Sequence, residues 1–323
     1  MPPGRLPLWP LILGLFLTLF LGSPGARAAP PRVLLVNGGA GPLHEQVSAS
    51  LRQALAGDRE STVVAEAVDL DGWQRLVAES GRLADFRLVV SIGTRATDAV
   101  LALEGPKPPL LACFLPRRTW ERLLAQYRPD ENPVSALVLD QPLGRQLALA
   151  RLLLGSQSRV GVMLGADSAE QAPQLESLAQ RQDLRLQLLQ LAPNEKPSER
   201  FRELLPGLDL VLGLPDPQVF DRVSSKWILY SSYQARVPVL AYSRALVEAG
   251  ALAAVYSTPE QIGRQTAGLV PGLLAARPGE AAVVHPDAFD LAVNRAVARS
   301  LGLDPPSEEL MKEALSAPDG GGD

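Results

Sequence analysis

The amino-acid sequence predicts an α/β protein built from two parallel sheets flanked by helices. Short apolar runs alternate with amphipathic stretches along most of the chain, which is typical of strands joined by crossover helices. Most of the apolar runs show no polar alternation, as expected for strands buried on both faces. A polar stretch bounded by prolines at 129–133 separates two such series. We therefore expect two copies of one architecture.

The elements follow in order along the chain. In the first series the expected strands are 33–36, 63–68, 88–92, 110–114 and 135–139, and the expected helices are 43–55, 73–83, 96–103 and 120–126. In the second series the expected strands are 160–164, 185–191, 208–212, 237–242, 251–256 and 281–284. Its expected helices are 143–154, 170–182, 198–205, 219–233, 247–249, 262–274 and 290–301. The tail 316–323 is small, polar and glycine-rich, which predicts disorder.

Residues 1–28 have the pattern of an export signal. Arg5 precedes an apolar block at 8–21, and Ala-Arg-Ala at 26–28 forms a small-x-small cleavage site before Ala29. The apolar block is shorter than the roughly 20 residues that span a bilayer. We predict cleavage after Ala28 and a periplasmic protein; the alternative is an uncleaved anchor.

The charge and the cysteine content exclude several classes of function. The chain has a net charge of −4, and because Arg5 and Arg27 are the only charged residues among the first 28, the remainder carries −6. Neither nucleic acid nor an anionic membrane is an expected partner, since both favour clustered Lys and Arg. The single cysteine, Cys113, lies in an apolar run and is expected to be a buried structural thiol. With two histidines and no cysteine cluster, we expect no metal site and no cofactor.

Ligands of open parallel sheets bind at the carboxyl ends of the strands. Asn37 and Gly38 open a glycine-rich turn after the first strand, but the glycine spacing fits neither a dinucleotide fingerprint nor a phosphate loop. The turn is either a tight strand-to-helix connection or a loop whose free backbone N–H groups face a small ligand. Gly93 and Thr94 make a similar turn after the third strand, in which the Thr94 hydroxyl is a further group that could contact a ligand.

Charged residues after three other strands are candidate ligand contacts. At least one of Arg117 and Arg118 would reach the cleft and bind a carboxylate or phosphate, or else the two form a solvated surface pair. Asp140 would contact the ligand or cap the helix that follows it. Asp216 lies between two prolines, which predicts a rigid, exposed carboxylate suited to an amine or a hydroxyl.

Catalysis is not expected. His44 lies in a helical pattern and His285 precedes a proline, and no serine has the nucleophile-elbow pattern. The aspartates at loop ends are common features of α/β proteins. The sequence therefore predicts a binding protein rather than an enzyme.

Several segments resemble the tryptophan/tyrosine-type ABC-transporter substrate-binding proteins. The resemblance covers most of the chain and is specific from about residue 135 to 303. The matching segments, in order, are Ser135–Asp140 with Leu147–Leu149, Arg159–Val162, Arg236–Ser243, Glu248–Ala254, Gln261–Ala267, Val293–Asn294 and Ala298–Leu303.

This resemblance implies a two-lobed type I periplasmic-binding-protein fold with three hinge strands and a ligand between the lobes. By the family pattern, one lobe takes 31–137 and 258–283, and the other takes 138–257 and 284–323. Asp216 matches a ligand-binding Asp of the family, Ser243 a polar position after the next strand, and Gly93 with Thr94 a first-lobe turn. Pro217 replaces a family Asn, and Gly165-Ala166-Asp167 replaces an Asn/Ser-rich turn.

The predicted function is capture of a small polar ligand between two lobes and its delivery to an inner-membrane ABC permease, by a monomer. The alternative is a ligand-sensing module of the same fold that serves a signalling or outer-membrane uptake partner. Neighbouring genes for a permease and an ATPase would distinguish the two functions.

Overall fold

The computed structural model describes residues 29–57, 63–79, 81–128, 133–275 and 282–316. The predicted signal segment 1–28 and residues 317–323 of the predicted disordered tail lie outside these ranges. Within the described ranges, no helix has the length and apolar character needed to cross a membrane.

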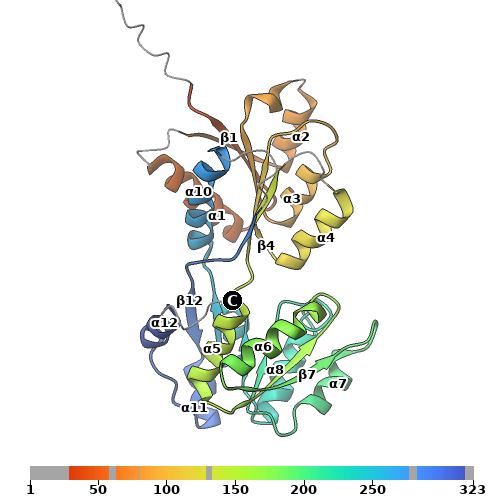
Figure 1. The fold of residues 1–323 in the computed structure, drawn as a ribbon, viewed down its shortest axis with the longest axis vertical. Coiled ribbons are helices and arrows are strands. Elements are labelled where there is room, and N and C mark those ends of the chain that lie inside the picture. Colours follow the sequence, from red (N-terminus) through yellow and green to blue (C-terminus); the bar gives the residue numbers. More distant parts are fainter. Residues whose placement is uncertain (1–28, 58–62, 80, 129–132, 276–281, 317–323) are drawn as a thin grey trace, which may run out of the picture. The chain divides into compact units, whose positions relative to one another are not determined.

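The strands form two six-stranded sheets (Figure 1). The first sheet has the order β11-β5-β4-β3-β1-β2, and its described strands all pair in parallel. Its strands are β1 (Arg32–Asn37), β2 (Val64–Asp69), β3 (Leu88–Ile92), β4 (Leu110–Leu115), β5 (Val134–Val138) and β11 (Val283–Val284).

The second sheet repeats this order as β12-β10-β9-β8-β6-β7. Its strands are β6 (Arg159–Leu164), β7 (Arg185–Gln190), β8 (Leu210–Leu212), β9 (Val239–Ala241), β10 (Ala253–Tyr256) and β12 (Asp290–Val293). In each sheet the first strand, β1 or β6, lies between the second and third strands of that series. The chain therefore adds its second strand on one side of the first strand and the later strands on the other side. The two predicted copies of one architecture are confirmed.

One element of the second sheet corrects the sequence prediction. Residues 290–293, expected to begin a helix, form β12, which pairs antiparallel with β10 at the sheet edge. Asn294 then caps a shorter helix, α11 (Arg295–Leu301), by accepting a hydrogen bond from the N–H of Val297 at 3.1 Å. The sequence prediction also missed the last helix, α12 (Glu308–Ser316).

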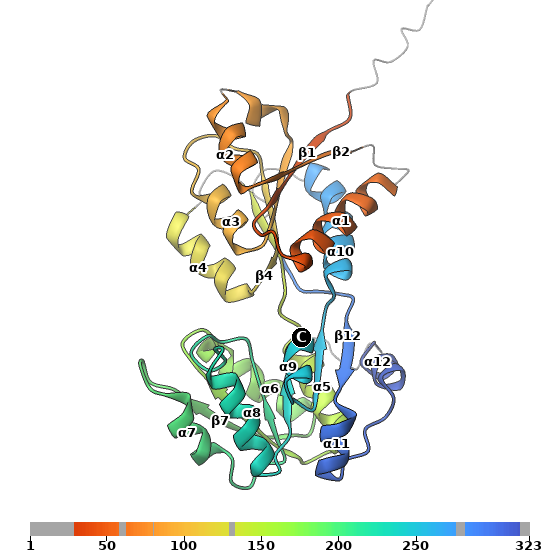
Figure 2. The same cartoon turned by 180° about the vertical axis from the view of Figure 1, so that it is seen from behind.

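Helices cover both faces of the first sheet (Figures 1 and 2). One face carries α1 (Pro42–Gly57) and α10 (Pro259–Ala275), whose buried side chains include Val47, Leu51 and Ile262. The other face carries α2 (Leu70–Ala78), α3 (Thr94–Leu101) and α4 (Arg117–Tyr127), with Trp120 fully buried.

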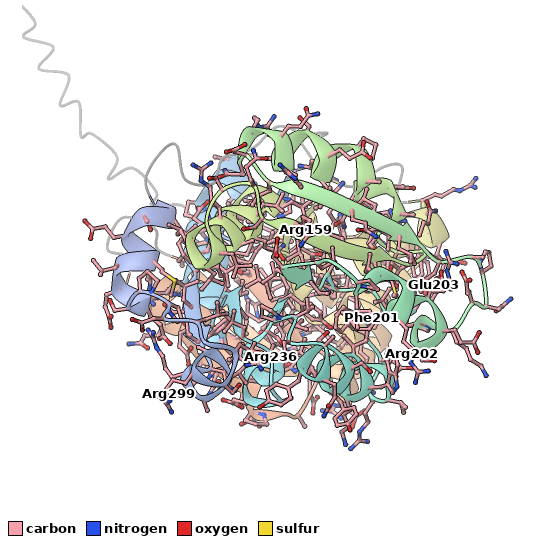
Figure 3. The ribbon with its side chains drawn as sticks, turned by 90° about the horizontal axis from the view of Figure 1, so that it is seen from below. Arg159, Phe201, Arg202, Glu203, Arg236 and Arg299 are labelled. Atoms are coloured by element: carbon pink, nitrogen blue, oxygen red, sulfur yellow. The ribbon has the colours of Figure 1, made fainter. Side chains whose placement is uncertain are left out.

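The second sheet is covered in the same way (Figures 1 and 2). The core on one face includes side chains from α5 (Leu143–Leu154), α6 (Ala172–Arg181), α11 and α12. The core on the other face includes side chains from α7 (Pro197–Leu204), α8 (Ser224–Gln234) and α9 (Arg244–Glu248). Arg159, at the start of β6, and Arg236, after α8, lie at the edge of this sheet where strands begin (Figure 3).

Cys113 lies in β4 with no exposed surface, so the predicted buried thiol is confirmed. Burial raises the pKa of this thiol to about 12, against a weaker lowering by a hydrogen bond with Thr266. Because the thiolate is the reactive form, Cys113 is an inert core residue.

Candidate functional site

The glycine turns of the first sheet contact the ring of His44. A Cβ atom at Gly93 would lie 2.5 Å from His44 Nε2, and one at Gly39 would lie 3.0 Å from the same ring. Gly93 also has a φ of +86°, which L side chains rarely adopt. These glycines therefore have a structural reason to be small that does not involve a ligand.

The backbone N–H groups of these turns are not free. Gly38 donates to the carbonyl of Ile92 at 2.9 Å, and Gly93 donates to the carbonyl of Cys113 at 2.9 Å. Asn37 accepts a hydrogen bond from Gly39 N through its side-chain oxygen at 3.3 Å. Of the two alternatives for these turns, a loop with free N–H groups is wrong for Gly38 and Gly93, because the adjacent strands use both donors; ligand contacts of Asn37, Gly38 and Gly93 stay a prediction. Thr94 is the first residue of α3, and its contact with a ligand stays a prediction.

His44 in turn contacts Phe114, which the sequence analysis did not select. The two rings meet edge to face with centroids 5.0 Å apart, and burial lowers the pKa of His44. Phe114 has a φ of +59°, at a point where the register between β4 and β5 shifts. A bulky residue in that conformation is a recognised mark of functional sites.

The guanidinium groups of Arg117 and Arg118 are paired within the protein. Arg117 binds Glu121 at 2.8 Å, and Arg118 binds Glu121 at 2.7 Å and Glu170 at 2.8 Å. Ligand binding by Arg117 stays a prediction, but it would compete with the pair that Arg117 forms with its own helix.

Asp140 caps a different helix from the one predicted. Its carboxylate accepts a hydrogen bond from the backbone N–H of Arg117 at 2.6 Å, at the first residue of α4. The helix that follows Asp140 begins after Pro142 with no side-chain cap, so the expected cap of that helix is wrong. Burial raises the pKa of Asp140, against the opposing effects of the Arg117 hydrogen bond and the charge of His285.

Asp216 is buried, with 2% of its surface exposed, so the predicted exposed carboxylate is wrong. Its Oδ2 accepts from the backbone N–H of Ser168 at 2.9 Å and from the Ser168 hydroxyl at 2.7 Å. Its Oδ1 accepts from Gln218 N at 2.8 Å. Asp216 thereby joins the loop after β8 to the loop after β6.

The most apolar of the described cavities has a volume of about 590 Å³. Of the predicted site residues it brings together Asp140 and Ser243; the hydroxyl of Ser243 also caps α9. The other predicted residues do not line it. Much of its wall comes from the carboxyl ends of β4, β9 and β10 and from the starts of α1 and α10. The lining residues are Leu43, Gln46, Phe114, Pro116, Leu139, Asp140, Gln141, Gln146, Pro215, Tyr242, Ser243, Arg244, Ala245, Glu248, Tyr256, Ser257, Thr258, Pro259 and Glu260.

Three aromatic wall residues, Phe114, Tyr242 and Tyr256, were not among the predicted contacts. Each stands at or next to the carboxyl end of a strand, a position that would have identified them. Tyr242 packs edge to face on Phe220 with centroids 5.8 Å apart, which holds its ring in place. The exposed surface of the cavity is thus mainly apolar and partly aromatic, with polar groups placed among the apolar ones, as in small-molecule sites.

A family model described as ABC transporter substrate binding protein matches residues 83–317. The chain belongs to this family. Its members are non-enzymatic binding proteins that act outside the cytoplasm, so this protein is a solute-binding protein for an ABC transporter with a small ligand. No match is found among curated protein sequences.

Solved structures support the fold. A ligand-free, open substrate-binding protein with adhesive properties from Clostridium difficile is 19% identical, with a TM-score of 0.64 over 86% of this chain and 97% of that one. An ABC domain in complex with L-Trp from Streptococcus pneumoniae is 17% identical, with a TM-score of 0.57 over 88% and 98%. A conserved domain protein from Vibrio cholerae is 19% identical, with a TM-score of 0.56 over 87% and 97%. The predicted family and the two-sheet fold are confirmed.

Proposed function

We propose that this solute-binding protein holds one small molecule in the 590 Å³ cavity and delivers it to an inner-membrane ABC permease. The observation that carries the proposal is the position of the cavity. Its wall includes the carboxyl end of β4 in the first sheet and the carboxyl ends of β9 and β10 in the second. In parallel α/β sheets, ligands bind at these ends.

Three connections pass from one sheet to the other, between β5 and α5, between β10 and α10, and between β11 and β12. We propose these as the hinge, with lobes of 31–137 plus 258–283 and 138–257 plus 284–323. Two of the connections contribute residues 139–141 and 257–258 to the cavity wall, and the start of α10 adds residues 259–260. A ligand that contacts both sheets favours a closed state by its differential affinity for that state. The permease would then distinguish loaded from empty protein.

The aromatic wall predicts the effect of Phe114→Ala. Small molecules released by denaturing the purified protein are first identified by mass spectrometry, and the identified ligand is titrated calorimetrically. We expect Phe114→Ala to weaken its binding about tenfold or more, since a buried aromatic side chain contributes roughly 1.5–3 kcal/mol. Tyr230→Ala is the control, because Tyr230 lies on α8 with 65% of its surface exposed. Equal affinities of the Phe114→Ala variant and the unsubstituted protein would place the site elsewhere.

We also propose that residues 1–28 are removed on export. N-terminal sequencing of protein from a periplasmic fraction is expected to begin at Ala29. Recovery of the protein from the membrane pellet with residues 1–28 retained would contradict this proposal.

A further inference from the structure

The charged residues of the cavity wall are mostly acidic. Asp140, Glu248 and Glu260 line it together with a single cation, Arg244. Arg244 is already paired, because its Nε lies 3.0 Å from a carboxylate oxygen of Glu248. Among the described wall residues, no unpaired cation is therefore present to neutralise the carboxylate of a ligand. The remaining charge favours a cationic ligand.

Asp140 is the acidic group best placed to bind such a cation. Its carboxylate accepts a hydrogen bond from the backbone N–H of Arg117, and no salt bridge within 4.0 Å joins it to another described side chain, although the charges of His285 and Arg117 act on it from nearby. Burial makes the charged form costly and raises the pKa of Asp140, although the hydrogen bond from Arg117 and the charges of His285 and Arg117 act in the opposite direction. A ligand ammonium group beside this carboxylate would offset that cost.

Gln146 adds an independent observation. Only 3% of its surface is exposed, and its Oε1 atom has no hydrogen-bond partner among the described residues. Its Nε2 donates to the carbonyl of Gln141 at 3.2 Å. Because a carbonyl can only accept, this bond fixes the orientation of the amide and leaves Oε1 as the unpaired acceptor. A buried acceptor without a donor destabilises the folded protein, and a ligand donor beside it would remove that cost.

We propose that the cavity selects a small cationic amine with an apolar or aromatic body and that it does not require a carboxylate on the ligand. The ammonium group pairs with Asp140, Gln146 Oε1 accepts a second hydrogen bond from it, and Phe114, Tyr242 and Tyr256 pack around the body. This assignment rests on the proposed function, since it names the ligand class of the same cavity. The aromatic rings suit a cation as well, because their faces attract positive charge.

Three matched probes test the ligand class: 2-phenylethylamine, L-phenylalanine and 3-phenylpropanoate. They share a phenyl ring and a short chain and differ in the amine and the carboxylate. In calorimetric titrations at neutral pH, we expect 2-phenylethylamine to bind at least tenfold more tightly than either of the others. Equal or tighter binding of the carboxylate or of the amino acid would overturn the proposal, and so would failure of all three to bind.

Asp140→Asn tests the ammonium partner. Asparagine keeps an oxygen that can accept from Arg117 N, so the α4 cap is retained while the charge is lost. We expect 2-phenylethylamine to bind ten- to a hundredfold more weakly to this variant, with a melting temperature of the unliganded protein equal to or above that of the unsubstituted protein. Asp167→Asn, after β6 and outside the cavity wall, is the control and is expected to change neither quantity. Unchanged amine affinity in Asp140→Asn would contradict the assignment.

Identification of the small molecules released by denaturation distinguishes failure of the amine assignment from failure of the proposed binding function. A released ligand without an amine would leave the binding function standing and overturn the amine class. A protein that releases no small molecule and binds none of the three probes would overturn both.

Discussion

Replacing Asp216 with alanine is expected to lower the free energy of unfolding by about 3 kcal/mol. The carboxylate is buried and accepts three hydrogen bonds, from Ser168 N, Ser168 Oγ and Gln218 N. Hydrogen bonds to a charged group contribute roughly 1.5–3 kcal/mol each, and the cost of burying the carboxylate, which alanine does not incur, offsets part of their sum. The loss exceeds the roughly 1 kcal/mol of an average substitution because several bonds are lost together.

Urea denaturation of the unliganded protein measures this effect. Asp167→Ala is the matched control, since Asp167 also follows a strand of the second sheet and is only half-buried. We expect the control to change the free energy of unfolding by less than about 0.5 kcal/mol. If the Asp216→Ala variant is as stable as the control, the hydrogen bonds in the structure do not hold the two loops together in solution.

Asp216 also shows why the site was harder to predict than the fold. The two prolines beside it predict a rigid loop, but the side chain that pairs with the buried carboxylate, Ser168, is 48 residues away in the sequence. A side chain at the end of a parallel strand looks the same in the sequence whether it faces a ligand or a neighbouring loop. Asp140 illustrates the same point, because its partner Arg117 belongs to a helix of the first series.

The strands were predictable because buried parallel strands appear as continuous apolar runs between turns. β12 was not, since its four residues run directly into a helix and pair antiparallel only at the sheet edge. Helix α12 was missed as well, although Met311 and Leu315 stand four residues apart and are both buried. Phe114 was assigned to a strand, and the sequence carries no mark of its positive φ.

Substitution of Gly263 is expected to have the second large effect on stability. Gly263 lies in α10 where this helix contacts α1, and a Cβ atom there would lie 2.7 Å from the carbonyl oxygen of Val47 and 2.9 Å from Leu51 N. Both atoms belong to the backbone of a helix, so neither can move aside without displacing α1. A hydrogen bond from Ser50 Oγ to the carbonyl of Glu260, at 2.9 Å, also holds the two helices together.

We expect Gly263→Ala to lower the free energy of unfolding by about 2 kcal/mol, as overpacking does in well-packed cores. Gly268→Ala is a control in the same helix, because no atom lies within 4 Å of a Cβ placed there. That substitution is expected to raise stability by up to about 1 kcal/mol, since alanine favours helices more than glycine does. Urea denaturation distinguishes the two, and a loss of stability in Gly268→Ala similar to that in Gly263→Ala would assign the effect to helix propensity or another cause. Because Leu43 and Gln46 at the start of α1 line the cavity, displacement of this helix in Gly263→Ala is also expected to weaken ligand binding.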